Sequence, residues 1–257
     1  MISIGHGGYL GRLGNCLFQA AALISHAYRL NETVLFPTEW EYMKAYFRFP
    51  KIVEFSDNRQ LSNMYNEAGF HYTPLPQIKN CTYGGYFQSE KYFKDHAPII
   101  ADIFRHSYIL RPPVEDRSPQ CFIHVRRGDY LGLQDYHSVL SIEYYHHAIE
   151  LMRSFGVNHF VVLSDDVTWA CEHLGSIEGI TIGSRSTVSA GGMDHMDDFG
   201  LGQDCDHAII GPSSFSWWMA WLIRNPLKKV IYPKVWFGPK NAHLNTRDLT
   251  PPNWIAL

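Results

Sequence analysis

The chain has 257 residues, of which 46% are apolar and 18% are charged, and its formal net charge is -3. This is the composition of a globular protein, and the length suits one large domain or two domains of roughly 100 to 150 residues. No uninterrupted apolar run reaches the roughly 18 residues that a membrane-spanning helix needs. Nucleic-acid binding requires a broad excess of Lys and Arg, so the acidic balance excludes a general nucleic-acid surface.

The N-terminal residues, MISIGHGGYLGRLGN, contain no basic segment ahead of an apolar run of signal-peptide length, so we expect a cytoplasmic protein. Five cysteines are spread at wide intervals without a CxxC pair, a pattern that signals neither a zinc site nor a disulfide framework. We expect all five to be reduced core residues. They are Cys16, Cys81, Cys121, Cys171 and Cys205.

The first half of the chain opens with a β-loop-α-β pattern. Residues 1–4 are expected to form a strand, the Ala-rich segment 16–30 a helix and residues 33–36 a second strand, with a Gly-rich turn after the first strand. Residues 37–120 mix aromatic residues and prolines without a clear period, so the pattern does not define their elements. A domain boundary is marked by Pro112, Pro113 and Pro119.

The second half alternates strands and helices, which is typical of a parallel sheet. Helices are expected at 141–152, in the segment that ends at Leu174 with Gly175 as its cap, and from 212–214 onward. The expected strands are 121–125, 160–163, 179–182, 207–210 and, as the last, 229–232. We therefore predict an α/β protein with two Rossmann-like domains, residues 1–117 and residues 118–257, and a C-terminal tail able to pack back on the first domain.

Polar clusters follow three of these strands, in the sequences HVRRGD, SDD and GPSSFSWW. Ligands of open parallel sheets gather at the carboxyl ends of the strands, so we expect the three clusters to meet. The adjacent guanidinium groups of Arg126 and Arg127 repel each other, and anions from the protein or a ligand must hold them together. Strand alternation places Arg126 on the face of His124 and Arg127 on the opposite face. We expect one arginine to bind a phosphate and the other to pair with a carboxylate of the protein.

Two of these clusters also have plain structural explanations. Ser213 and Ser214 begin a helix, where free amides favour a phosphate, but Ser is also a common N-cap, and capping alone is the more frequent case. Asp165 and Asp166 are equally N-caps, and they offer a divalent metal too few oxygen ligands. The aromatic stripe that begins at Phe215 has helical spacing, which is more typical of a core than of a sugar-binding platform.

Common cofactor motifs are absent from the sequence. The first turn is rich in glycine but contains no GxGxxG, which gives little support to a nicotinamide or flavin cofactor. A kinase or phosphatase would need a P-loop or a nucleophile motif, and the sequence has neither. The residues by themselves point to an α/β enzyme that acts on a phosphate-bearing ligand.

Five segments in chain order resemble the α-1,2-fucosyltransferases of glycosyltransferase family 11, nearly from end to end. HVRRGDY resembles the HxRRxD motif, FVVLSDD the second motif, and DCDHAIIGPSSFSWWMAWL the third, followed by an IYPKVWF tail of the usual kind. GRLGNCLFQAA resembles the GNQ-type opening shared with protein O-fucosyltransferases, and GGYFQSEKYF a segment of the bacterial members. Three positions depart from the pattern. Cys16 replaces Gln, Pro212 replaces Asn, and Gly202 replaces a frequent Met.

The resemblance implies a GT-B-like fold and an inverting transfer of L-fucose from GDP-β-L-fucose to the 2-hydroxyl of a galactoside. It implies no cofactor and no required metal. The expected partners are GDP-fucose and a galactose-containing glycan. Animal members carry a Golgi membrane anchor that this sequence lacks, which favours a cytoplasmic microbial-type enzyme. Its acceptor would be soluble or lipid-linked, and a lipid-linked glycan would associate it peripherally with a membrane.

The resemblance also assigns roles by position. Arg126 would bind the phosphate and stabilise the charge that develops as the sugar leaves. His124 would lie near the guanosine, and Asn15 would face the transferred sugar. Asp165 or Asp166 would hold the nucleotide or shape the loop beside it. The expected pyrophosphate contacts are Ser213, Ser214 and Phe215.

The general base is not fixed by the sequence. Asp129 is the first candidate, but it could equally orient Arg126 or Arg127, and a dissociative path in which a phosphate oxygen takes the proton late needs no base. Two other functions stay open. One is a fucosyltransferase of another linkage, either α-1,6 or to protein Ser/Thr, and the other is a silent protein that only binds nucleotide sugar or glycan.

Overall fold

The computed structural model describes residues 1–5, 11–57, 61–105, 118–184 and 194–257. The chain forms two compact units. Unit 1 contains Met1–Arg105 and Leu244–Pro252, and unit 2 contains His106–His243 and Asn253–Leu257. The predicted boundary after residue 117 adjoins residues 106–117, which lie outside the described residues, as do Pro112 and Pro113. None of the helices in the described residues combines the length and the hydropathy needed to cross a membrane.

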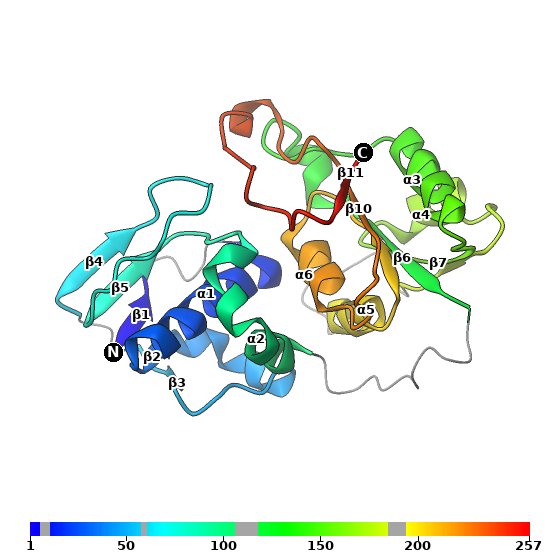
Figure 1. The fold of residues 1–257 in the computed structure, drawn as a ribbon. Helices are drawn as coiled ribbons and strands as arrows, with labels where there is room; N and C mark the ends of the chain where they lie inside the picture. The colour runs from blue at the N-terminus through cyan, green and yellow to red at the C-terminus, as the bar shows by residue number, and fades with distance from the viewer. Residues whose placement is uncertain (6–10, 58–60, 106–117, 185–193) are drawn as a thin grey trace. The chain divides into compact units, whose positions relative to one another are not determined.

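Unit 1 is built on a parallel sheet with the strand order β3-β2-β1-β5-β4 (Figure 1). Its strands are β1 (Ile2–Ile4), β2 (Val34–Phe36), β3 (Val53–Phe55), β4 (Asn63–Asn66) and β5 (Cys81–Gly84). Its helices are α1 (Leu13–Leu30), α2 (Ala97–Phe104) and the 3-10 helices η1 (Thr38–Ala45), η2 (Glu90–Tyr92) and η3 (Lys94–His96). The predicted β-loop-α-β opening is confirmed.

Helix α1 forms the centre of this unit. It contacts β1, β2, α2 and η2, and most of its length is buried. The Ala-rich run Ala20–Ala22 suits this position, because small side chains allow close packing and Ala has the highest helix propensity. The helix ends at Asn31, whose φ of 51° is the left-handed C-terminal conformation that Asn tolerates.

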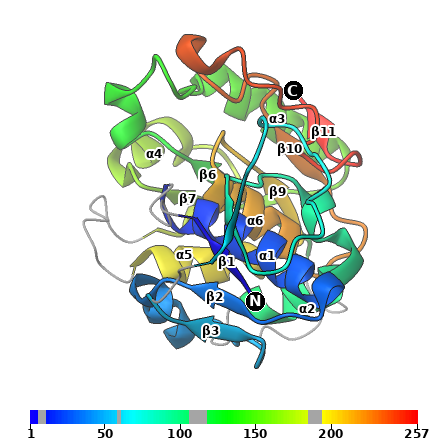
Figure 2. The same cartoon turned by 90° about the vertical axis from the view of Figure 1, so that its left-hand side faces the viewer.

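Unit 2 is a six-stranded parallel sheet with the order β11-β10-β9-β6-β7-β8. Figure 2 labels β6, β7, β9, β10 and β11 of this sheet. The strands are β6 (Gln120–Val125), β7 (His159–Ser164), β8 (Ile180–Ile182), β9 (His207–Ile209), β10 (Val230–Tyr232) and β11 (Ile255–Ala256). The helices are α3 (Ile142–Ser154), α4 (Val167–Leu174), α5 (Asp194–Gln203), α6 (Ser214–Leu222) and the 3-10 helices η5 (Asp129–Gly132) and η6 (Pro239–Asn241).

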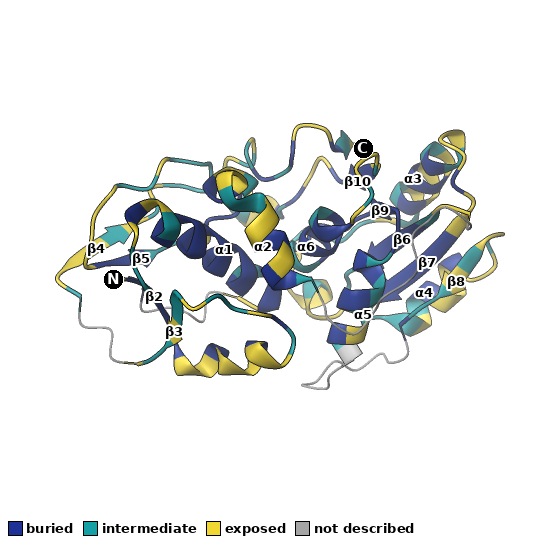
Figure 3. Cartoon of the chain, turned by 60° about the horizontal axis from the view of Figure 1, so that its bottom comes forward, coloured by how far each residue is buried: buried dark blue, intermediate teal, exposed yellow. Residues whose placement is uncertain are grey.

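The central strands of unit 2 are buried on both faces (Figure 3). Cys121, Ile123 and Val125 face a core that includes side chains of α3 and α4. His124 faces the other way and contacts Phe215 of α6. These two covered faces explain the near-continuous apolar run of β6, which is typical of strands in parallel sheets.

The predicted fold class, two Rossmann-like parallel α/β domains, is confirmed. Three details differ from the sequence analysis. Helix α5 was not predicted, and 229–232 is not the last strand, because β11 pairs with β10 near the C-terminus. The expectation of five core cysteines is wrong for Cys171, which is exposed because it lies on the outer face of α4.

Candidate active site

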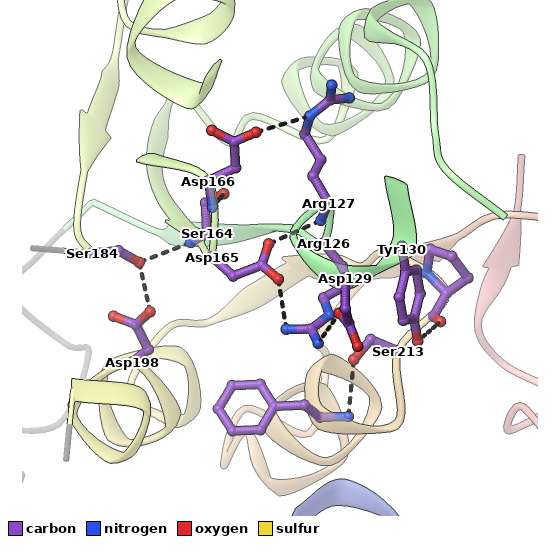
Figure 4. Close-up of polar contacts among 12 residues, drawn as sticks. Arg126, Arg127, Asp129, Tyr130, Ser164, Asp165, Asp166, Ser184, Asp198 and Ser213 are labelled. Atoms are coloured by element: carbon purple, nitrogen blue, oxygen red, sulfur yellow. Dashed lines mark hydrogen bonds and ion pairs between the residues drawn. The ribbon is translucent and has the colours of Figure 1, made fainter. Parts of the chain in front are cut away.

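The three polar clusters meet at the carboxyl ends of neighbouring strands, as predicted. Strands β9, β6 and β7 are adjacent in the sheet, and the segments that follow them contact one another. Arg126, after β6, pairs with Asp165, after β7, and the hydroxyl of Tyr130 donates a hydrogen bond to the carbonyl of Pro212, after β9, at 3.3 Å (Figure 4). A single edge of the sheet therefore collects most of the charge of the three motifs.

Arg126 is held by two carboxylates. Its Nη1 lies 2.6 Å from Asp165 Oδ2, and its Nη2 donates a hydrogen bond to Asp129. The guanidinium also lies over the ring of Tyr130, 5.2 Å from the ring centroid. A Cβ on Gly211 would come within 3.9 Å of Arg126 Cβ, so the arginine lies beside the segment that leads into α6.

Arg127 points to the opposite face, as strand alternation predicts. Its Nε lies 3.3 Å from Asp166 Oδ2, and its guanidinium stacks 4.4 Å from the ring centroid of Trp169 on α4. Both arginines therefore pair with the protein's carboxylates, whereas the sequence favoured such a pair for one of them, because the two strand ends place enough carboxylates within reach of each guanidinium. The phosphate contact expected of the other arginine stays a prediction.

Asp165 also shapes the turn after β6. Its Oδ1 accepts a hydrogen bond from the backbone N–H of Arg127 at 2.9 Å, in addition to the ion pair of Oδ2 with Arg126. A Cβ on Gly128 would come within 2.6 Å of Oδ2, so the glycine of HVRRGD allows this close approach. The geometry matches the second role predicted for Asp165, shaping the loop.

Asp166 is the N-cap of α4, where its Oδ1 accepts from the backbone N–H of Trp169 at 3.1 Å. Its own N–H donates to Ser164 Oγ at 2.9 Å. Sequence reasoning missed the next two partners. Ser184 Oγ accepts from the N–H of Ser164 at 2.8 Å and donates to Asp198 Oδ2 at 2.6 Å (Figure 4). Neither residue belongs to a quoted motif, so the sequence held no local signal for them.

Helix α6 begins at this same edge. Ser213 is its N-cap and accepts a hydrogen bond from the N–H of Phe215 at 3.3 Å, which is the structural role that the sequence left open. Ser214 is the first helical residue. Trp217 and Trp218 are fully buried, so the expectation that the aromatic stripe is core holds for its two central residues. Phe215, at its start, is only partly buried and lies against His124.

His124 is buried and uncharged near neutral pH. Burial, together with the nearby positive charge of Arg126, lowers the pKa of His124 to about 3. Its ring centroid lies 5.7 Å from that of Phe215, and its Nδ1 has no hydrogen-bond partner within the described part of the chain. The site therefore combines a fixed guanidinium with a neutral imidazole. Across the same described residues, no group of three or more His, Cys, Asp and Glu is arranged to hold a metal ion.

The model of glycosyl transferase family 11 matches residues 11–257 of this sequence. The chain belongs to that family. Two curated relatives from Escherichia coli are each 29% identical to it: the O-antigen biosynthesis glycosyltransferase WbnK, over 70% of this chain, and an alpha-1,2-colitosyltransferase, over 67%. These matches cover 62% and 61% of the relatives, so the chain spans less than two thirds of the length of the curated relatives it matches.

The fold of this family 11 member is also found in a solved structure. The NodZ alpha-1,6-fucosyltransferase soaked with GDP-fucose aligns with a TM-score of 0.52 over 86% of this chain and 92% of its own, at 14% sequence identity. At that identity the likeness shows the fold alone, which is GT-B-like.

Asn15, the remaining predicted site residue, belongs to unit 1. It lies in the first turn of α1, and its Oδ1 accepts a hydrogen bond from Gln88 Nε2 at 2.8 Å. The arginine cluster belongs to unit 2. The roles predicted for Asn15 and for the cluster stay predictions.

The departures from the family 11 pattern fit their surroundings. Cys16 is buried in α1, and burial raises the pKa of its thiol to about 12, so it is an inert core residue. A Cβ on Gly202 of α5 would come within 2.6 Å of the sulfur of Met219 on α6, so glycine permits this helix contact. Pro212 has no backbone N–H to donate, and its carbonyl accepts a hydrogen bond from the hydroxyl of Tyr130.

Proposed function

We propose that this protein is an inverting, metal-independent galactoside α-1,2-fucosyltransferase that uses GDP-β-L-fucose. Family membership supports the reaction class. One observation of the site carries the proposal: Arg126 is fixed by carboxylates at the carboxyl end of β6, beside the start of α6. A helix N-terminus and a guanidinium together suit a diphosphate.

In the proposed reaction, the acceptor hydroxyl attacks C1 of fucose from the side opposite to GDP. The bond from C1 to the β-phosphate oxygen breaks, and its electron pair stays on that oxygen. A guanidinium already in place stabilises this charge more in the transition state than in the ground state, and losing such a donor costs roughly a hundred-fold or more in rate. Arg126 supplies this group, since Asp165 holds it in position.

The two carboxylates on Arg126 then have different roles. Asp165 is 12% exposed and also holds the backbone of Arg127, so it stays on Nη1. Asp129 is 34% exposed, nearly three times as much as Asp165, and accepts a hydrogen bond from Nη2. A bound diphosphate would replace Asp129 at Nη2. Asp129 would then be able to accept the proton of the acceptor hydroxyl, unless a phosphate oxygen takes it late.

The other predicted site residues have consistent places in this proposal. His124 is neutral and lies beside Phe215, which suits contact with the guanosine. The start of α6, with Ser213 and Ser214, would receive the pyrophosphate. Asn15 of unit 1 would face the transferred sugar. A galactose-containing glycan would be the acceptor, and a lipid-linked glycan would bring this protein to a membrane surface.

A second donor is favoured by one relative. The alpha-1,2-colitosyltransferase is as similar to this chain as WbnK is, so a nucleotide-linked colitose is the alternative to GDP-fucose. An α-1,6 linkage has no comparable support, because the likeness to NodZ shows only the fold.

GDP release would test the proposal. The wild type and Arg126→Ala are assayed in EDTA with GDP-fucose or GDP-colitose, a panel of β-galactosides and a galactose-free control, and the product linkage is determined. Galactoside-dependent turnover of GDP-fucose that persists in EDTA, gives an α-1,2 product and falls about a hundred-fold in the variant is expected. Loss of turnover in EDTA would refute metal independence. GDP binding without turnover would indicate a silent binding protein.

A further inference from the structure

The loop after β5 in unit 1 has a strained backbone. Phe87 is fully buried and has a φ of 51°, a strained left-handed conformation that bulky residues rarely adopt. Such strain persists only where the surroundings enforce it, and it is concentrated at functional sites. Phe87 directly precedes Gln88, so the strained residue determines where Gln88 is placed.

Glu67 enforces this conformation. Its Oε2 accepts hydrogen bonds from two consecutive backbone N–H groups, those of Tyr86 at 2.9 Å and Phe87 at 3.1 Å, and its Oε1 accepts from the hydroxyl of Tyr92 at 2.9 Å. A Cβ on Gly85 would come within 2.5 Å of Glu67 Cβ, so the loop packs tightly against this side chain. Glu67 is partly buried, and this burial raises the pKa of its carboxyl group.

The loop delivers Gln88 to Asn15. Gln88 is 6% exposed, and its Nε2 lies 2.8 Å from Asn15 Oδ1, although the two residues are 73 positions apart. On its other side Asn15 lies against Gly11, which has a φ of 89° and where a Cβ would come within 2.0 Å of Asn15 Nδ2. The hydrogen bond from Gln88 thus holds the carboxamide of Asn15, and the missing side chain of Gly11 leaves the space that Nδ2 occupies.

We propose that Gln88 is a positioning residue that fixes the orientation of the Asn15 carboxamide for the transferred sugar, and that Glu67 holds Gln88 in place through the loop. This inference rests on the proposed function, in which Asn15 faces that sugar. An amide has a donor end and an acceptor end. Since Gln88 donates to Oδ1, a flip of Asn15 alone would bring two NH₂ groups together and leave the buried Nε2 of Gln88 unpaired.

The orientation matters because a hydrogen bond to a sugar hydroxyl is productive only in one geometry. A side chain that is already fixed loses no further conformational freedom when the substrate binds, and it holds the reacting atoms in place. Loss of Gln88 should therefore lower kcat more than it raises KM. If the hydrogen bond between Gln88 and Asn15 only linked α1 to the loop, the loss of Gln88 would lower the stability of the protein, and any effect on activity would not depend on the Asn15 side chain.

The chain provides a matched control. Gln19 also reaches Asn15, but its Nε2 donates to the backbone carbonyl, at 3.2 Å, and not to the carboxamide. We would compare Gln88→Met and Gln19→Met, each alone and with Asn15→Ala, measuring kcat, KM and melting temperature with the donor that the wild type uses. We expect Gln88→Met to lower kcat by about ten-fold, Gln19→Met to leave it within two-fold, and Gln88→Met to have no further effect in the Asn15→Ala background.

Equal effects of the two Gln variants on kcat, or an undiminished effect of Gln88→Met in the Asn15→Ala background, would overturn the inference. If the wild type transfers neither sugar, the proposed function fails, but the orientation can still be tested. The side-chain NH₂ resonances of Asn15 are assigned by their loss in Asn15→Ala. They should shift in Gln88→Met, and unchanged resonances would show that Gln88 does not position the amide.

Discussion

The two units hold their predicted site residues by different physical means. In unit 2, Asp129, Asp165 and Asp166 hold two guanidinium groups at the ends of adjacent strands. In unit 1, Asn15 is held by the neutral amide of Gln88, which a strained loop supports. The difference follows the chemistry proposed for each side, because a diphosphate requires fixed positive charge and a sugar hydroxyl requires an oriented neutral partner.

The charged site of unit 2 and the neutral site of unit 1 should also differ in how much they contribute to stability. Guanidinium groups at the edge of a sheet remain ordered only if carboxylates compensate them, so unit 2 depends on ion pairs for stability as well as for function. The hydrogen bond between Gln88 and Asn15 in unit 1 depends on the backbone conformation of the loop after β5. Its removal should lower activity more than it lowers stability. The following predictions test this contrast, from the largest expected effect to the smallest.

Removal of Asp165 should destabilise the protein most. Asp165→Ala deletes the carboxylate that contacts both Arg126 and the backbone of Arg127, and we expect a loss of about 3 kcal/mol in urea unfolding. The matched Asp166→Ala removes the carboxylate that pairs with Arg127 and caps α4. Because this carboxylate is 26% exposed, the free energy of unfolding should fall by only about 1 kcal/mol. Equal losses would show that the arginine cluster does not depend on Asp165 in particular.

Restoring a frequent family residue at position 202 should also destabilise unit 2. Gly202→Met places atoms where Met219 of α6 already packs, and we expect a loss of about 2 kcal/mol by overpacking. Gly132→Met is the control, because a Cβ at Gly132 meets no atom within 4 Å. Chemical unfolding of both variants gives the comparison, and similar stabilities would mean that α5 and α6 can separate without cost.

Unit 1 contains an ion pair that should contribute less. Asp248 is 9% exposed, pairs with Lys91 at 2.5 Å and accepts from the N–H of Tyr72 at 3.1 Å, so Asp248→Ala should lose about 1 kcal/mol. Asp95→Ala, which breaks the exposed pair with Arg29, should change stability by less than about 0.5 kcal/mol. If Asp248→Ala lost as much as Asp165→Ala, the contrast between the two units would not hold.

Both units should share a weak sensitivity to acid. Burial lowers the pKa of His26 in unit 1 to about 4 and that of His124 in unit 2 to about 3. The unfolded chain binds protons at these residues below about pH 6.5, whereas the folded protein does not, so stability falls as the pH falls from 6.5 towards these values.

We expect the melting temperature to drop by a few degrees between pH 7 and pH 5. The drop should be smaller in His26→Gln and in His124→Gln. His173→Gln, which changes an exposed histidine on α4, should leave the size of this drop in melting temperature unchanged. An identical drop in all three variants would assign the acid sensitivity to other groups.

The sequence predicted the charged site better than the neutral one, for a physical reason. Arg126, Asp129 and Asp165 stand directly after strands with strong apolar signals, and parallel strands must end at a common edge. The pairing of both arginines could not be predicted, because it depends on side-chain distances across two strands. Asn15 was found only through family resemblance, and Gln88 not at all, since their contact joins residues 73 positions apart.

The missed elements are those whose structure depends on tertiary contacts. Helix α5 contains Gly200 and Gly202, which weaken its helical signal, and it packs against α6. Strand β11 has two residues and is defined by its pairing with β10. Strand β4 is largely exposed and polar, so its sequence lacks the apolar alternation by which strands are recognised.

The composition of unit 1 has a consequence for the order of folding during synthesis. Asp248, whose carboxylate contacts Lys91 and Tyr72, belongs to a segment that joins unit 1 after the whole of residues 106–243 has been made. Domains of most multidomain chains fold from the N-terminus as they leave the ribosome. Here the first unit to emerge cannot complete its contacts until residue 248 is outside the exit tunnel, so its folding finishes only after unit 2 has been synthesised as far as residue 243.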